Sequence, residues 1–230
     1  MNARNIEETV KDLLDSSAER IASGDIDGAI ADLKSAEILD PSNPVILCSI
    51  AAAYAKDSLF VTAVEYCAKI ENMNSGFIDM DKVRLLKAYS LSKLNRFDEA
   101  EILTKKILSS FPDDPVALNI SGYISEKRGD IKEAVSFYKK ILANDSLNPT
   151  AMNSIAYLMA KSGLDLNSAL VFAKKAHEKD RENPAYLDTL GFVYLKRGDY
   201  ELAKKYIKQA FEKMPGNEEI KSHLNELLKL

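Results

Sequence analysis

The sequence predicts an all-α fold, a solenoid of antiparallel helix hairpins stacked one on the next. Three observations predict it: a pattern that returns about every 34 residues, small residues at fixed places in every copy, and prolines and glycines at the expected helix ends. A single hairpin cannot bury its apolar faces alone, so successive hairpins have to stack. The predicted repeat units are residues 10–43, 44–80, 81–114, 115–148, 149–183 and 184–217.

Two columns of small residues run through the six units. Antiparallel helices joined by a short turn approach to about 8 Å only where small side chains face each other. Both columns are therefore expected at the helix crossing inside each hairpin. The first column is Ala29, Ala63, Ala100, Ala134, Ala169 and Ala203, and the second is Ser17, Ala51, Ala88, Gly122, Ala156 and Gly191.

Proline and glycine mark the predicted helix ends. Prolines stand at the first turn of four units, where a missing N–H removes no hydrogen bond. Glycines stand between the two helices of three units, where the chain needs a left-handed conformation. The prolines are Pro44, Pro115, Pro149 and Pro184, and the glycines are Gly24, Gly129 and Gly198.

The last unit carries the clearest form of the pattern. It reads Leu187-x2-Leu190-Gly191-x2-Tyr194, followed by Ala203-x3-Ile207, Ala210 and Pro215. This spacing resembles the tetratricopeptide repeat (TPR), with Leu187 in place of its tryptophan and Ile207 in place of its phenylalanine. The resemblance covers nearly the whole chain. It implies a right-handed superhelical solenoid in which the first helices of the hairpins line a concave, peptide-binding surface.

Two regions differ from the regular pattern. Residues 75–80 lengthen the second unit by about three, and Arg84 and Lys87 then occupy positions where the repeat has large apolar residues. We interpret this as a local change of packing angle, with an apolar side chain of 75–80 filling the gap; a side pocket is the alternative. The candidates for filling it are Phe77, Ile78 and Met80.

The C-terminal segment 218–230 predicts a further helix. Ile220, Leu224, Leu227 and Leu228 recur at helical spacing. We expect a capping helix that covers the open end of the stack. The chain 1–230 is then a single solenoid domain of six hairpins and one cap.

Composition excludes several classes of protein. The chain is 46% hydrophobic, which excludes disorder, and its net charge of −4 argues against a nucleic-acid partner. No apolar run approaches the ~20 residues of a membrane helix, so no membrane insertion is expected. The acidic N-terminus resembles no signal peptide. With only two cysteines, these features predict a cytoplasmic protein.

No catalytic pattern is present in the sequence. The nine glycines are dispersed, so they form no phosphate-binding loop. His177 and His223 lie far apart in the sequence, and each is expected as a partly exposed helix residue. Cys67 is expected in the core and Cys48 on the inner face. We therefore predict no enzyme activity, no metal and no cofactor.

The inner face of each first helix can be read from residues four apart. It carries a row of aromatic rings, a row of lysines and two amides. Aromatics offer rigid apolar area, amides can pair with an extended backbone, and lysines attract acidic segments. The predicted partner-binding residues are Tyr89, Lys93, Asn119, Tyr123, Lys127, Asn153, Tyr157, Lys161, Asp188, Phe192 and Lys196.

Two functions stay open at this point. The first is a non-catalytic scaffold or adaptor that binds a peptide segment or helix, acidic in character, in the concave groove. The alternative is a structural subunit of a larger assembly, which uses solenoid edges or self-association. A monomer or a weak homo-oligomer fits either function. The lysines are also compatible with solubility alone, and the aromatics with packing against the next hairpin.

Overall fold

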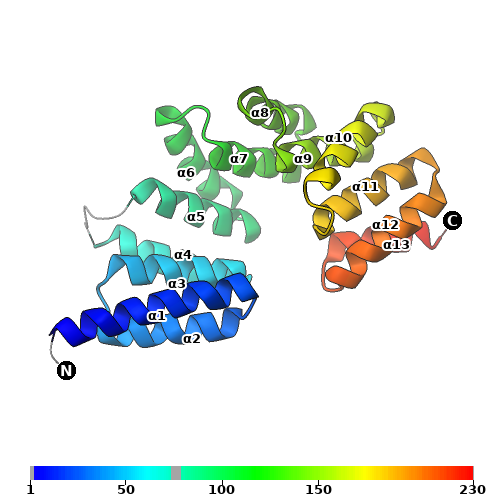
Figure 1. Cartoon of the computed structure of the whole chain (residues 1–230). Coiled ribbons are helices and arrows are strands. Elements are labelled where there is room, and N and C mark those ends of the chain that lie inside the picture. Colours follow the sequence, from blue (N-terminus) through cyan, green and yellow to red (C-terminus); the bar gives the residue numbers. More distant parts are fainter. Residues whose placement is uncertain (1–2, 74–78, 230) are drawn as a thin grey trace. The chain divides into compact units, whose positions relative to one another are not determined.

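The computed structural model describes residues 3–73 and 79–229, and within them every regular element is an α-helix (Figure 1). This confirms the predicted all-α class. The described residues form thirteen helices: α1 (Ala3–Ser23), α2 (Ile26–Leu39), α3 (Pro44–Lys56), α4 (Phe60–Glu71), α5 (Met80–Lys93), α6 (Phe97–Ser110), α7 (Pro115–Lys127), α8 (Ile131–Asn144), α9 (Pro149–Lys161), α10 (Leu166–Lys179), α11 (Pro184–Arg197), α12 (Tyr200–Lys213) and α13 (Glu218–Leu227).

The chain divides into two compact units, Met1–Ile120 and Ser121–Leu230. In the first unit α1 pairs with α2, α3 with α4, and α5 with α6, while α2 also packs on α3 and α4 on α5. In the second unit α9 pairs with α10 and α11 with α12, and α13 packs on α12 and α11. Each unit is therefore a stack of helical hairpins.

The turn inside each hairpin contains a residue in the left-handed conformation, and the turn between α9 and α10 contains two, Gly163 and Asp165. Glycine has this role at four turns, including Gly24 with a φ of 88° and Gly198 with a φ of 84°. Ser58 and Asn95 have it at the other two, with φ of 63° and 59°. Left-handed backbone disfavours residues with a Cβ, so glycine is the expected residue here and these two positions are strained.

Helix starts follow the predicted proline signal. Pro44, Pro149 and Pro184 each occupy the first turn of a helix. An asparagine precedes each proline and caps the helix; the side-chain Oδ1 of Asn43, for example, accepts a hydrogen bond from the backbone N–H of Val45. The cap satisfies a donor that has no partner within the helix.

The small-residue columns lie at the helix crossings, as predicted. All six alanines of the first column are fully buried. A Cβ placed on Gly191 would lie 2.7 Å from the side chain of Ile207 and 2.9 Å from its backbone nitrogen. A Cβ on Gly122 would lie 2.7 Å from the ring of Tyr138. These contacts show that α12 approaches α11, and α8 approaches α7, too closely for any larger residue.

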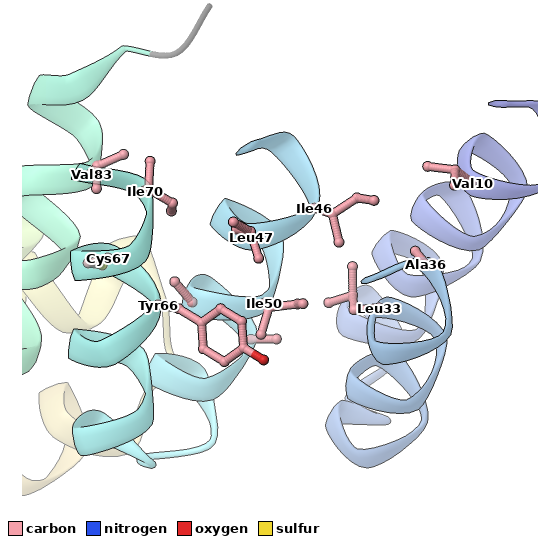
Figure 2. Close-up of a cluster of buried hydrophobic side chains, with 12 residues drawn as sticks. Val10, Leu33, Ala36, Ile46, Leu47, Ile50, Tyr66, Cys67, Ile70 and Val83 are labelled. Carbon is pink, nitrogen blue, oxygen red and sulfur yellow. The ribbon is translucent and has the colours of Figure 1, made fainter. Parts of the chain in front are cut away.

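The core of the first unit joins three successive hairpins. Leu33 from α2, Ile50 from α3 and Tyr66 from α4 belong to one buried cluster (Figure 2). Cys67 is fully buried in the same cluster, as predicted, and burial raises the pKa of its thiol to about 12. Met80 packs partly buried against it. The other two candidates for the gap, Phe77 and Ile78, lie outside the described residues.

Arg84 and Lys87 replace apolar residues without leaving their charges unpaired. Arg84 forms an ion pair of 2.6 Å with Asp81 on the same helix. Lys87 pairs with Glu71 at 2.5 Å, which links α5 to α4. The Lys87–Glu71 ion pair therefore joins the two helices at a position where the repeat pattern has an apolar residue.

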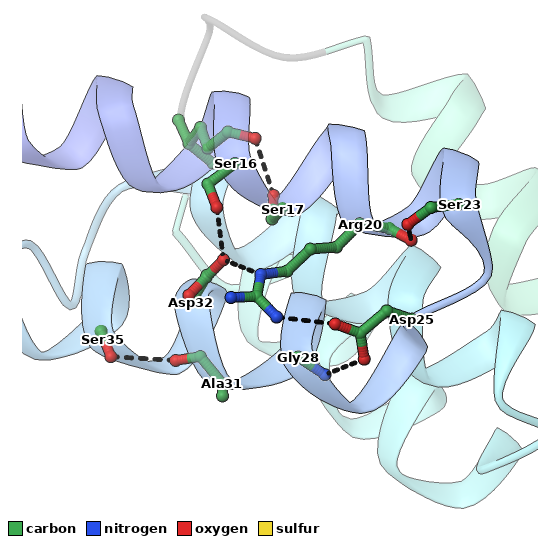
Figure 3. A network of polar contacts seen from close by, with 10 residues as sticks. Ser16, Ser17, Arg20, Ser23, Asp25, Gly28, Ala31, Asp32 and Ser35 are labelled. Carbon is green, nitrogen blue, oxygen red and sulfur yellow. Dashed lines mark hydrogen bonds and ion pairs between the residues drawn. The ribbon is translucent and has the colours of Figure 1, made fainter.

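A polar network ties α1 to α2 in the first hairpin (Figure 3). The guanidinium of Arg20 contacts Asp25 at 2.6 Å and Asp32 at 2.9 Å, and the Ser16 hydroxyl donates to Asp32. Asp25 also caps α2 by accepting the backbone N–H of Gly28. The Gly28 N–H and the Arg20 guanidinium hold the pKa of Asp25 below its usual value. The network fixes where α2 begins.

Candidate functional site

The predicted partner-binding residues divide between the two units. Tyr89 and Lys93 on α5 and Asn119 on α7 belong to the first unit. Tyr89 is 38% exposed and meets the ring of Phe60 edge to face at 5.9 Å. The remaining eight residues lie in the second unit, on α7, α9 and α11.

A cavity of about 170 Å³ brings five of these eight residues together. It lies between the C-terminal part of α7, α9, α11 and the start of α13. The predicted residues that line it are Tyr123, Lys127, Asn153, Tyr157 and Asp188. Lys161, Phe192 and Lys196 do not line it. Glu126 and Glu219 add two carboxylates that the sequence did not single out.

Tyr157 links the cavity wall to α13. Its hydroxyl donates a hydrogen bond of 2.6 Å to the Glu219 carboxylate. Burial and the carboxylate together raise the pKa of Tyr157 far above its usual value. The tyrosine ring also lies 5.7 Å from Phe192 and 6.1 Å from His223. Tyr157 is therefore held in place before any ligand arrives.

Asp188 and His223 form a buried pair, each 5% exposed. His223 Nδ1 lies 2.8 Å from Asp188 Oδ2. Burial raises the pKa of Asp188, and the hydrogen bond from His223 opposes that change. The expectation that His223 is partly exposed is wrong, because α13 places this ring against the inner face of α11.

Phe192 is covered by the same helix. Its ring stacks on His223 with 4.0 Å between centroids and an interplanar angle of 18°, and only 4% of the residue is exposed. The sequence placed Phe192 in an open row, but it left the orientation of 218–230 undefined. The sequence did contain one signal of this contact. Asp188 stands where the preceding repeats have Asn119 and Asn153, and a buried carboxylate requires a partner.

Two acceptor oxygens among the cavity residues have no partner. Asn153 Oδ1 and Asp188 Oδ1 are buried and make no hydrogen bond. Leaving a buried acceptor unpaired costs about 1–3 kcal/mol, so folded proteins keep few of them. Both belong to residues that line one cavity.

The lysine row contacts the aromatic row of the same helices. In each pair the lysine follows the ring by four residues and places Nζ over its face. The distances from Nζ to the ring centre are 5.5 Å for Lys93 over Tyr89, 5.2 Å for Lys127 over Tyr123, 5.2 Å for Lys161 over Tyr157 and 4.9 Å for Lys196 over Phe192.

Carboxylates of the second unit also neutralise these lysines. Lys161 lies 3.8 Å from Glu126, and Lys127 lies 4.0 Å from the same carboxylate. Lys196 pairs with Glu226 of α13 at 2.6 Å. The lysines are therefore a weaker attraction for an acidic partner than the sequence suggests.

Across residues 3–73 and 79–229, no three His, Cys, Asp or Glu side chains are grouped so that they could hold a metal ion. None of the helices in this part of the chain has the length and apolar character that crossing a membrane requires.

Comparison with known proteins assigns the repeats to a family. Residues 85–149 and 184–217 match models of the tetratricopeptide repeat. The chain is thus a helical-repeat protein of the tetratricopeptide class. A TPR repeat-containing protein of Pseudomonas aeruginosa is 27% identical over 142 residues, which are 62% of this chain and 24% of the relative. The match therefore spans about a quarter of that relative's length. Repeats of this family generally mediate protein–protein interaction and are generally non-catalytic.

Several solved structures share the fold. PilW, described as a widely conserved type IV pilus biogenesis factor, gives a TM-score of 0.68 at 21% identity and covers 94% of this chain and 98% of its own. PilF of Pseudomonas aeruginosa gives 0.65 at 17% identity, over 96% and 99%. A chain of the APC/C hetero-tetramer Cut9–Hcn1 gives 0.75 at 14% identity, over 98% and 46%. At these identities the likeness shows the fold alone.

Proposed function

We propose that the chain is a non-catalytic adaptor that binds a segment of a protein partner on the inner face of its second unit. This face comprises the C-terminal part of α7 together with α9 and α11. The observation that carries the proposal is the cavity, where the predicted residues Tyr123, Asn153 and Tyr157 meet beside buried acceptors without partners. A bound segment would supply the missing donors.

The surroundings of the cavity suit a binding role. Tyr157 is fixed by Glu219 and by neighbouring rings, so little side-chain entropy is lost when a partner packs on it. An asparagine can pair with the N–H of an extended segment. Tyr89, Lys93 and Asn119 remain predicted contacts on the first unit.

A structural subunit is the second candidate, favoured by exposed apolar side chains on the second helices of hairpins. Ile102 on α6 is 67% exposed, and Val171 on α10 is also exposed. Such positions could contact other chains of an assembly. If the chain is such a subunit, sedimentation velocity should detect self-association. The Ile102→Glu variant should abolish it. The cytoplasmic location stays a prediction of the sequence.

Site-specific photocrosslinking tests the adaptor function. A photoreactive amino acid replaces Lys127 at the rim of the cavity, and in a matched control it replaces Lys132, an exposed lysine on α8 of the same unit. We expect a discrete adduct with one partner from position 127 in cells, and none from position 132. Adding Asn153→Ala should remove the adduct without changing the melting temperature.

Two results would contradict the adaptor function as proposed. Equal adducts from positions 127 and 132 would place the interface elsewhere on the second unit. An adduct from position 127 that survives Asn153→Ala and Tyr123→Ala would show that the cavity residues do not contact the partner.

A further inference from the structure

The cavity of the second unit is rich in negative charge. Three carboxylates line it, those of Glu126, Asp188 and Glu219. Among the described residues that line the cavity, Lys127 is the one lysine, and no arginine is present. Glu126 already contacts Lys127 and Lys161, so the negative charge that remains to attract a ligand is that of Asp188 and Glu219, and it favours a positively charged ligand.

One oxygen of the Asp188 carboxylate has a hydrogen-bond partner and the other has none. His223 Nδ1 lies 2.8 Å from Oδ2 and forms a hydrogen bond with that oxygen. The other oxygen, Oδ1, is buried without a partner although the side chain lines the cavity. The pairing with His223 fixes the orientation of the carboxylate, and a ligand donor reaches the buried Oδ1 when a neighbouring side chain moves aside.

The acceptors around the cavity outnumber what a single N–H can use. Asn153 Oδ1 and Asp188 Oδ1 lack donors, and the carboxylate-bearing residues Glu126 and Glu219 line the same cavity. A guanidinium carries five N–H donors in one plane and stays charged at any physiological pH, whereas an ammonium carries three. Arginine therefore satisfies this set better than lysine does.

We propose that the cavity receives an arginine side chain of the bound partner segment. The proposal rests on the proposed function, because it requires a partner on the inner face of the second unit. It changes the expected chemistry of that partner, since the lysine row alone suggested an acidic segment. The guanidinium would pair with Asp188 Oδ1 and Asn153 Oδ1, and the carboxylate of Glu219 would add attraction.

Titration with a single capped amino acid tests the cavity without knowledge of the partner. The probe is N-acetyl-arginine methylamide, added to the isotope-labelled full chain and followed by NMR. Its matched control is N-acetyl-citrulline methylamide, which has nearly the same shape but no charge. We expect saturable shifts at residues of α9 and α11 with the arginine probe, weakening as salt rises, and none with the citrulline probe.

Three variants assign the binding to the named atoms. Asp188→Asn keeps the shape and should weaken binding about tenfold or more, because hydrogen bonds to charged groups are the strong ones. Asn153→Asp adds a charge at the unpaired oxygen and should tighten binding about fivefold, a gain that a merely damaged fold would not produce. Glu218→Gln removes an exposed carboxylate of α13 outside this cavity and should leave the affinity unchanged.

The outcomes separate this inference from the adaptor function. Equal shifts with arginine and citrulline probes, or no shifts at all, would overturn the arginine site while leaving the crosslinking result of the adaptor intact. Unchanged affinity in both Asp188→Asn and Asn153→Asp would overturn it as well. Shifts that require charge, fall with Asp188→Asn and rise with Asn153→Asp would establish it.

Discussion

Gly191→Ala tests whether close approach of two helices holds the last hairpin together. The new Cβ would lie 2.7 Å from the Ile207 side chain and 2.9 Å from the Ile207 backbone nitrogen. A side chain can rotate away, but a backbone nitrogen within α12 moves only if the whole helix moves. The contact therefore forces α12 away from α11.

The magnitude is a balance of two effects. Overpacking a close-packed contact typically costs about 1–3 kcal/mol. Alanine in a helix gains about 1 kcal/mol over glycine, which offsets part of that cost. We expect a net loss of about 1–2 kcal/mol in the free energy of unfolding, measured by urea denaturation and by hydrogen exchange in α11 and α12.

Gly216→Ala is the matched control. Gly216 lies in the turn before α13, its φ is outside the left-handed range, and a Cβ there would meet nothing within 4 Å. Stability should then stay near wild type. A Gly191→Ala variant as stable as Gly216→Ala would refute the close-packing argument.

The remaining predictions concern other parts of the chain. Ser58→Gly should raise the free energy of unfolding, measured by urea denaturation, by about 0.5–1 kcal/mol, because glycine adopts the left-handed conformation without strain. Asn95→Gly should raise it by less, since asparagine tolerates that conformation. Tyr157→Phe removes the donor to Glu219 and should lower stability by about 1 kcal/mol. The pKa of Tyr157 is raised in the folded state, so the unfolded chain loses this proton first; stability should fall as pH rises above about 10, less steeply in Tyr157→Phe. Deleting 218–230 should abolish hydrogen-exchange protection first in α11 and α12, and unchanged protection there would contradict a packing role for α13.

The hairpins were predictable because their signals are local. Alanine or glycine at a crossing, glycine in a turn and proline at a helix start each act on residues a few positions away, and the repeat shows each signal several times. Gly191 and Pro184 illustrate this: each has the role in the structure that its place in the repeat predicts. Ser58 and Asn95 show the limit, because these two turns lack the glycine that marks the others in the sequence.

The candidate site was predicted in part. Tyr123, Asn153 and Tyr157 follow from residues four apart on one helix face, and they do line one cavity. Glu126 and Glu219 were missed, because an acidic residue near a helix end usually reads as a solvated or dipole-favouring group. Nothing in the repeat indicates that Glu219 reaches a tyrosine 62 positions earlier.

The sequence by itself determined the helical class, the repeat, the turns and the crossings, since these depend on contacts within one hairpin. Only the tertiary structure decided where α13 lies, and with it the burial of Phe192 and the pairing of Asp188 with His223. An apolar stripe specifies that a helix must be covered, but not the rotation at which it docks or the polar groups that it brings along. Those depend on side chains from α9, α11 and α13 meeting in space, which no period in the sequence encodes.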